Sequence, residues 1–196
     1  VQTNVPIYLA SLGPKNLELT GRLADGWLPI WLHRDKLSEL KEPIVQAATR
    51  AGRDMADITV APQIMCYTAE SAQELAEVEG KVRSHMAYYI GGMGTYYYDL
   101  FCRSGFQPEA DAVREAWAVR DRDRAAEAIS SQMLDGIAVL GDAETCRSRL
   151  ERFRSAGADM PVITFPNGST LAGIQRTIEA LAPRQTGAKA GRGPAE

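Results

Sequence analysis

Apolar residues in this chain gather in short runs, and each run is followed by a segment with helical spacing. The runs that predict strands span residues 5–10, 27–32, 58–65 and 160–165. The first run is apolar throughout rather than alternating, which is typical of a parallel strand buried on both faces. The pattern therefore predicts four parallel strands of an α/β fold, either an open doubly wound sheet or part of an eight-stranded barrel.

Helical spacing follows the first three runs. It predicts a helix that opens at Gly13-Pro14 and ends before Asp25-Gly26, a second over 35–51 and a third over 69–89. Proline suits the first helical turn, where its missing N–H costs nothing. Asp35 is expected to cap the second helix, because a short carboxylate can accept from the free N–H groups of the first turn.

The segment of about 90–140 departs from this alternation and is predicted to be a helical insertion. Three helical patterns, over 97–103, 108–119 and 122–129, follow a stretch rich in glycine and tyrosine. Asp142 is predicted to cap a helix that continues to Ser155. The last helix is expected to end near Leu181. The chain is thus predicted to form one domain over 1–182, followed by a mobile tail over 183–196.

Composition removes several classes of protein. The 196 residues are 45% hydrophobic and carry a formal net charge of −3, so neither nucleic acid nor a membrane surface is expected as a partner. The three cysteines are widely spaced and indicate neither a disulfide framework nor a zinc site, which favours a cytoplasmic protein. No apolar run is long enough to span a membrane. Because Val1 is not Met, the gene product is expected to begin further upstream.

The loop after the first strand is the strongest candidate site. Ligands of parallel α/β folds gather at the carboxyl ends of strands. Ala10, Ser11, Leu12 and Gly13 offer successive backbone N–H groups and a hydroxyl at a helix N-terminus, and Lys15 adds a positive charge. Such a site suits a phosphate. The alternative is that Gly13-Pro14 is simply a turn and a helix start.

Other polar residues give weaker signals. His33, just beyond the second strand, could contact a ligand, but a solvated loop histidine is the favoured interpretation. His85 is expected to be structural. The tyrosines at 88, 89 and 96–98 either line a pocket or pack the inserted helices. The acidic residues 74, 77 and 79 and the arginines 147, 149, 152 and 154 are spaced as solvated helix faces. No catalytic residue and no metal ligand is predicted.

Several motifs, taken together, are distinctive. The chain carries PIYLASLGPK at Pro6–Lys15 and ADGW at Ala24–Trp27, and later motifs at Tyr89–Tyr97, Glu115–Trp117 and Gly141–Arg147. In order and spacing they resemble the C-terminal half of the luciferase-like monooxygenase superfamily. The resemblance covers about residues 5–182. It is nearest to the branch that uses the deazaflavin coenzyme F420, which includes methylenetetrahydromethanopterin reductase.

The resemblance implies a (β/α)8 TIM barrel, of which this chain would supply strands five to eight and the helical insertion. In that family the loop after the fifth strand holds the cofactor phosphate through backbone amides, here those of Ala10, Ser11, Leu12 and Gly13. The first four strands, which normally carry most ring contacts and the catalytic side chains, have no counterpart in this sequence. We therefore expect a truncated piece, a homo-oligomer, or a half that pairs with a complementing N-terminal half.

The function implied by the resemblance is hydride transfer between coenzyme F420 and a small organic substrate. An FMN-dependent monooxygenase that uses reduced flavin and oxygen is the alternative within enzymes. A non-catalytic half that binds cofactor or a partner is the alternative from another class.

Overall fold

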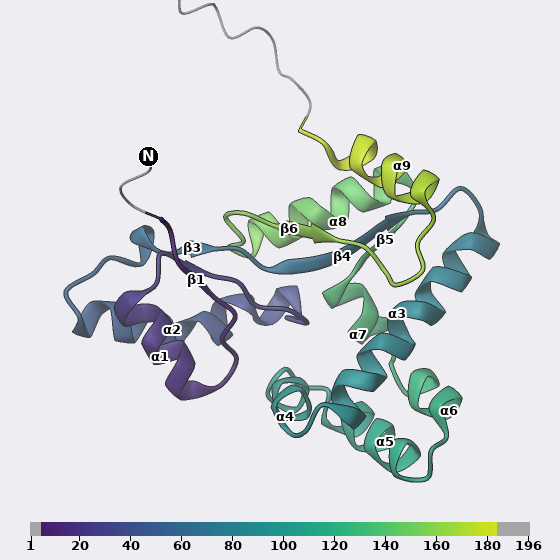
Figure 1. Cartoon of the computed structure of the whole chain (residues 1–196), viewed down its shortest axis with the longest axis horizontal. Coiled ribbons are helices and arrows are strands. Elements are labelled where there is room, and N and C mark those ends of the chain that lie inside the picture. The colour runs from purple at the N-terminus through teal and green to yellow at the C-terminus, as the bar shows by residue number, and fades with distance from the viewer. Residues whose placement is uncertain (1–4, 184–196) are drawn as a thin grey trace, which may run out of the picture.

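The structure of the protein is a computed structural model, and it describes residues 5–183. Within that range all strand pairs are parallel, as predicted, and they form two three-stranded ladders (Figure 1). The strands are β1 (Tyr8–Leu9), β2 (Gly26–Trp27), β3 (Thr59–Val60), β4 (Gln63–Thr68), β5 (Val139–Gly141) and β6 (Val162–Thr164).

Helices α1 and α2 pack together beside the first ladder, and α8 and α9 lie beside the second (Figure 1). The long helix α3 leads away from β4 to a group formed by α4, α5 and α6. The helices are α1 (Pro14–Leu23), α2 (Leu37–Arg50), α3 (Ala72–Gly92), α4 (Tyr96–Arg103), α5 (Gln107–Ala118), α6 (Arg122–Glu127), α7 (Ser131–Ile137), α8 (Ala143–Ser155) and α9 (Leu171–Leu181).

The segment 58–68 joins the two ladders. In the first ladder β2 lies between β1 and β3, and in the second β4 lies between β5 and β6. Pro62, which has no N–H, separates β3 from β4. Pairing nevertheless continues across the break, because the N–H of Gln63 donates to the carbonyl of Pro29 at 2.8 Å and the N–H of Val162 donates to the carbonyl of Pro62 at 2.9 Å. The result is one continuous parallel sheet.

The prediction of four strands is wrong, because β5 was missed. This strand has only three residues, and it pairs with Cys66–Thr68 along the carboxyl half of β4. Its side chains are buried, but so short an apolar run next to α7 and α8 has no periodicity of its own. Helix α7 was missed for the same reason. The predicted cap of α8 is confirmed, because the Asp142 carboxylate accepts from the N–H of Thr145 at 2.7 Å.

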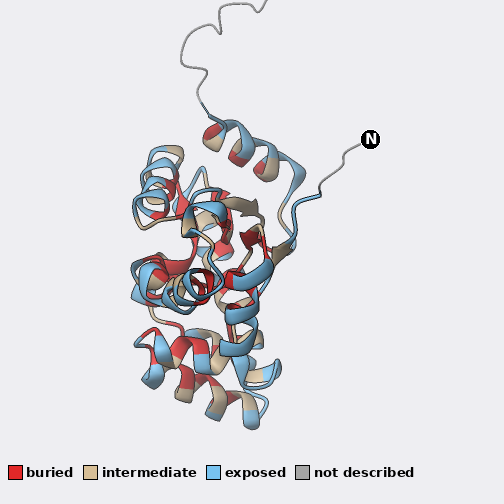
Figure 2. Cartoon of the chain, turned by 90° about the vertical axis from the view of Figure 1, so that its left-hand side faces the viewer, coloured by how far each residue is buried: buried red, intermediate tan, exposed pale blue. Residues whose placement is uncertain are grey.

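The first strand is not buried on both faces. Val5 and Ile7 are 67% and 59% exposed, because β1 is an edge strand within the described residues and nothing there covers it. Buried positions instead lie on the inner sides of the helices and on the central strands (Figure 2). The largest fully buried side chains include Trp27, Phe101 and Phe153. The tail was predicted over residues 183–196. All of it except Pro183 lies outside the described residues.

Candidate functional site

The loop after β1 leads directly into α1, with Gly13 as the N-cap residue and Pro14 in the first turn. No side chain caps this helix. Within residues 5–183 the backbone N–H groups of Ser11, Leu12 and Gly13 have no recorded protein acceptor. Free N–H groups at a helix N-terminus attract an anion, since they add to the positive end of the helix dipole. The loop therefore has the donors that a phosphate needs.

The Ser11 side chain is engaged inside the protein. Its residue is 2% exposed, and its Oγ lies 2.7 Å from Oγ1 of Thr20. Since the Thr20 hydroxyl donates to the carbonyl of Asn16 at 2.8 Å, Ser11 must donate to Thr20. The single hydroxyl proton of Ser11 is thus used, and the contribution of this residue to a bound anion is confined to its backbone N–H.

Positive charge near the loop comes from two elements. Lys15 is exposed in the first turn of α1, as the sequence suggested. Arg103, from α4, donates through Nη2 to the carbonyl of Leu12 at 3.3 Å. Arg103 was missed, because nothing in the local sequence indicates that α4 folds back onto this loop. Ala10 is exposed at the start of the loop and Tyr96 of α4 lies beside Gly13.

The prediction for His33 is wrong in both of its parts. The residue is buried, 6% exposed, rather than solvated. It is His33, not Asp35, that caps the following turn, because its Nδ1 accepts from the N–H of Asp35 at 3.3 Å. Its ring packs on the ring of Phe106, with centroids 5.0 Å apart. His33 therefore anchors the insertion to the loop after β2.

An ion-pair network surrounds that anchor. Arg34, 4% exposed, binds the side chain of Asp135 through Nη2 at 2.6 Å and the backbone carbonyl of the same residue through Nη1. Arg149 pairs with the other carboxylate oxygen at 2.7 Å. Burial alone would raise the pKa of Asp135, but the hydrogen bond from Arg34 and the charge of Arg149 hold it below its usual range. Arg149 is therefore not part of a merely solvated helix face.

The aromatic residues of the insertion pack mainly on one another. Trp31, which ends the β2 region with a φ of 62°, meets His85 and Tyr89 edge-on with ring centroids 5.3 and 5.5 Å apart. Tyr89 contacts Tyr97 at 4.6 Å. Because of these ring contacts, packing holds for Tyr89 and Tyr97 of the two alternatives for the tyrosines.

The left-handed backbone of Trp31 costs energy, because the residue is bulky, and such a conformation often marks a functional region.

Gly91, in the motif before α4, is explained by packing. A β-carbon there would overlap the ring of Trp117, a residue of α5. Tyr88 also contacts Trp117, with centroids 5.9 Å apart, and it lines a cavity. That cavity, of about 650 Å³, also contains His85.

A second polar cluster lies at the carboxyl end of β4. The Tyr67 hydroxyl donates to Glu74 at 2.8 Å, and Arg176 of α9 binds the same carboxylate at 2.6 Å. The hydrogen bond from the N–H of Glu70 lowers the pKa of Glu74, and Tyr67 and Arg176 act in the same direction. Glu74 therefore differs from the solvated residue that the sequence predicted. The cluster fixes α9 on β4.

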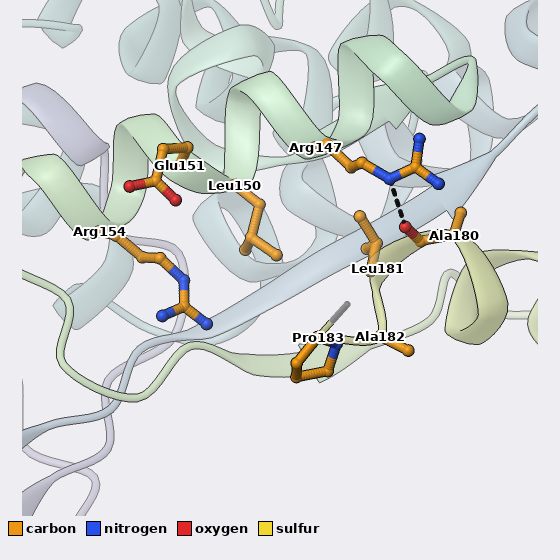
Figure 3. Close-up of a pocket in the computed structure, with 8 residues that line it drawn as sticks. All are labelled: Arg147, Leu150, Glu151, Arg154, Ala180, Leu181, Ala182 and Pro183. Atoms are coloured by element: carbon orange, nitrogen blue, oxygen red, sulfur yellow. Dashed lines mark hydrogen bonds between the residues drawn. The ribbon is translucent and has the colours of Figure 1, made fainter. Parts of the chain in front are cut away.

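A cavity of about 310 Å³ lies outside this region, between α8 and the end of α9 (Figure 3). Arg147 donates there from Nε to the carbonyl of Ala180 at 2.8 Å, and Arg154 lines the same cavity. The cavity lies beside the C-terminal end of a helix that follows β6, whereas ligands of parallel sheets gather at the carboxyl ends of the strands. We assign it no role in the candidate site.

Metal and thiol chemistry find no support in residues 5–183. No group of three or more His, Cys, Asp or Glu side chains there is placed to hold a metal ion. Burial raises the pKa of the Cys146 thiol to about 11 and raises that of Cys66 further, so neither is a reactive thiolate. Among the described helices, none is both long and apolar enough to cross a bilayer.

A parallel sheet whose first loop presents free N–H groups at a helix N-terminus is typical of α/β proteins that bind phosphorylated cofactors. Comparison with known families makes the class specific. The sequence model of the luciferase-like monooxygenase family matches residues 1–160. The chain belongs to this family.

Among curated proteins, one from Mycobacterium tuberculosis that is named as a coenzyme F420-dependent oxidoreductase is 28% identical over 172 residues. The match covers 84% of this chain and 48% of that protein. The 5,10-methylenetetrahydromethanopterin reductase of Methanolobus tindarius is 26% identical over 168 residues, 84% of this chain and 49% of the reductase. The chain thus spans about half the length of the curated relatives that it matches.

Solved structures agree on the fold. The F420-dependent tetrahydromethanopterin reductase of Methanopyrus kandleri superimposes with a TM-score of 0.64 at 18% identity, over 90% of this chain and 48% of the reductase. An F420-dependent secondary alcohol dehydrogenase, solved with an F420–acetone adduct, gives 0.57 at 18% identity over 92% of this chain and 50% of the dehydrogenase. The α/β fold of the chain therefore matches half of a luciferase-like TIM barrel.

Proposed function

We propose that this chain is part of an oxidoreductase that transfers a hydride between coenzyme F420 and a small organic substrate. The observation that carries the proposal is the loop at 10–13, whose free N–H groups and neighbouring cations suit the phosphate of a cofactor tail. Relatives named for coenzyme F420 in two separate comparisons favour the deazaflavin over FMN.

The residues of the loop fit a phosphate group. Ser11, Leu12 and Gly13 would bind it through backbone N–H groups, and Lys15 and Arg103 would offset its charge. Gly13 has an ordinary extended backbone, with φ −82° and ψ 153°, so no turn geometry demands glycine here. The missing side chain leaves room for a ligand instead. When bound, coenzyme F420 would supply the hydride chemistry, and this chain would orient its tail.

We further propose that the chain corresponds to the second half of the barrel, with β1 in the place of the fifth strand. The described edge strands β1 and β6 would then pair with strands of a complementing N-terminal half or of a second copy. The open edge is consistent with this, since Val5 and Ile7 are exposed beside it.

A titration tests the cofactor. Quenching of the three tryptophans should report saturable binding of coenzyme F420, and Gly13→Val should weaken it at least about tenfold by crowding the phosphate. A β-carbon on Gly13 would lie 3.9 Å from the Tyr96 ring, which is ordinary contact, so the variant should fold normally. Lys15→Gln should weaken binding less, and Lys41→Gln, on α2, is the matched control.

Three results would decide against the proposal. Tight binding of FMN with no binding of coenzyme F420 would favour the flavin monooxygenase, the activity in the name of the family. Unchanged affinity of the Gly13 variant would remove the loop from the site. Binding of neither cofactor, together with stable association with a second half-barrel chain, would favour an interaction protein.

A further inference from the structure

A short stretch of the insertion contacts both the loop at 10–13 and His33. Arg103, the last residue of α4, donates to the carbonyl of Leu12 at 3.3 Å. Three residues later, the ring of Phe106 packs on the ring of His33 with centroids 5.0 Å apart. Both rings are buried, since the two residues are each 6% exposed. The candidate phosphate site and the buried histidine are therefore contacted from the same turn at the end of α4.

The backbone holds these two contacts at a fixed spacing, because α4 ends in a Schellman motif. The N–H of Phe106 donates to the carbonyl of Phe101 at 3.0 Å. The N–H of Gly105 donates to the carbonyl of Cys102, also at 3.0 Å, and Gly105 has the positive φ, 90°, that is typical of this motif. Since Phe106 is bonded to the end of α4 in this way, a displacement of its ring displaces Arg103 as well.

The surroundings of His33 suit only the neutral ring. Nδ1 accepts from the N–H of Asp35 at 3.3 Å, so the proton of the neutral ring is on Nε2. Nε2 lies against the backbone of Gly136 and is buried without a hydrogen-bond partner among residues 5–183. A second proton would have to bind Nδ1, where it meets the N–H of Asp35. Both N–H groups of the cation would then lack an acceptor, and burial of a charge without such partners is costly.

The charged groups that face the ring, from its own loop and from α7, do not remove this cost. Arg34 is 4% exposed and carries a permanent positive charge. The exposed carboxylate of Asp35 lies 4.0 Å from Nδ1, beyond hydrogen-bond distance, and also pairs with Arg34. Asp135 of α7 is already bound by Arg34 and Arg149. Burial consequently lowers the pKa of His33 in spite of the two carboxylates.

We propose that His33 is a pH switch for the loop at 10–13: when its ring binds a second proton, the end of α4 leaves His33 and anion binding at the loop weakens. The inference rests on the proposed function, since it concerns the regulation of the same phosphate site. Acidification favours the released form, because the pKa of His33 is lowered while α4 is in place and returns toward about 6.5 once the ring reaches solvent.

Linkage also fixes what a bound anion does to His33. An anion that binds better while α4 is in place must make the ring harder to protonate, so it lowers the pKa of His33. A direct attraction between the anion and the charged ring would raise that pKa instead. The direction of this shift therefore distinguishes the switch from a simple effect of charge.

Nuclear magnetic resonance tests the switch without a ligand. The sequence has two histidines, so the ring signals of His33 are readily assigned by substitution. Between pH 7.5 and 5.5 the guanidinium signal of Arg103 should shift with the same apparent pKa as the His33 ring, and His33→Asn should abolish this shift. The amide signal of Thr145, in the cap of α8, should stay constant. A constant Arg103 signal, or a Thr145 signal that changes together with it through global unfolding, would overturn the proposal.

Phe106→Leu tests the same contact from the side of the insertion. This variant keeps an apolar side chain but loses the contact between the two rings, so Arg103 should no longer follow the titration of His33. His85→Gln is the matched control, since it removes the other histidine. Loss of the Arg103 titration in His85→Gln would assign the switch to that residue and overturn the role of His33.

Sulfate tests whether the switch acts on the phosphate site. It keeps both negative charges between pH 7.5 and 5.5, and the amide signals of Leu12 and Gly13 report its binding. Its dissociation constant should rise about fivefold or more over this range, and saturating sulfate should lower the pKa of His33. A constant affinity, or a raised pKa of His33, would overturn the proposal. Absence of sulfate binding at every pH would instead contradict the proposed phosphate site, and the Arg103 titration would still decide whether His33 controls α4.

Discussion

The imidazole ring of His33 lies against the backbone of Gly136, in the space that a β-carbon at that position would occupy. The contact joins the loop after β2 to α7, two segments far apart in the sequence. Here glycine is required by close approach and not by backbone conformation, since Gly136 is not among the residues with positive φ.

Replacement of Gly136 should therefore be costly. Gly136→Ala should lower the free energy of unfolding by about 1–3 kcal/mol, because the added methyl forces the ring and α7 apart. Urea denaturation followed by circular dichroism measures the change. Gly80→Ala is the matched control, since nothing lies within 4 Å of its added methyl and alanine favours a helix. Equal effects of the two substitutions would contradict the close contact.

Stability should depend on pH through His33. Burial lowers its pKa below 6.5, and Arg34 acts in the same direction, against the carboxylates of Asp35 and Asp135. Below about pH 6.5 the unfolded chain thus binds a proton that the folded chain does not, so stability falls as pH drops toward the folded pKa. Unfolding in urea between pH 7.5 and 5.5 measures this loss.

The matched variant is His33→Asn, which keeps a side-chain acceptor for the capping bond and does not titrate. Its stability should change less with pH than that of the unsubstituted protein, although it is lower at pH 7.5 through loss of the contact with Phe106. The remaining slope includes the half-buried His85, whose pKa burial also lowers and which is common to both proteins. Parallel profiles would rule out His33 as the source.

The ion pair around Arg34 should be worth more than those on the surface. Asp135→Asn removes the closer of the two carboxylates that pair with the buried guanidinium, leaving Asp35 at 3.5 Å, and should lower the free energy of unfolding by about 2–4 kcal/mol. Glu39→Gln is the control, because the exposed pair of Lys36 and Glu39, 2.9 Å apart, should contribute less than about 0.5 kcal/mol. Denaturation of both variants in the same buffer decides whether this difference exists.

Substitution of Ser11 should affect stability, whereas substitution of Gly13 should affect cofactor affinity. Ser11→Ala removes the hydrogen bond to Thr20 and should cost about 1 kcal/mol of stability while cofactor affinity stays unchanged. Gly13→Val should have the opposite profile, with normal stability and weak binding. Paired thermal unfolding and cofactor titration give both values. A large loss of affinity in the Ser11 variant would mean that its hydroxyl, not its backbone, faces the ligand.

The parallel sheet and most helices could be predicted because apolar periodicity and caps are local properties of the sequence. The cap at Asp142 is one example. Strand β5 could not be predicted, because three buried residues are too few to show a periodicity and form a strand only by pairing with β4. The exposure of Ile7 could not either, since an apolar sequence does not say whether a neighbouring strand is present.

The candidate site was predictable to a similar degree. The loop at 10–13 could be predicted as a candidate phosphate site, because a strand that ends directly before a helix start can be recognised from neighbouring residues alone. Arg103 reaches its place through the fold of the insertion, and no local signal in the sequence brings it beside this loop. His33 was misjudged because a histidine in a short loop is usually exposed, whereas here Phe106 and Gly136 enclose it.

The segment 58–68, which both ladders share, couples the unfolding of one ladder to that of the other. Because this one stretch hydrogen-bonds to β2 in the first ladder and to β5 and β6 in the second, neither ladder can lose it without disrupting the other. Its amide protons should consequently exchange with solvent by global unfolding, and those of β1 by fraying at the edge. The two ladders then behave as a single cooperative folding unit whose slowest-exchanging amides lie between Thr59 and Thr68.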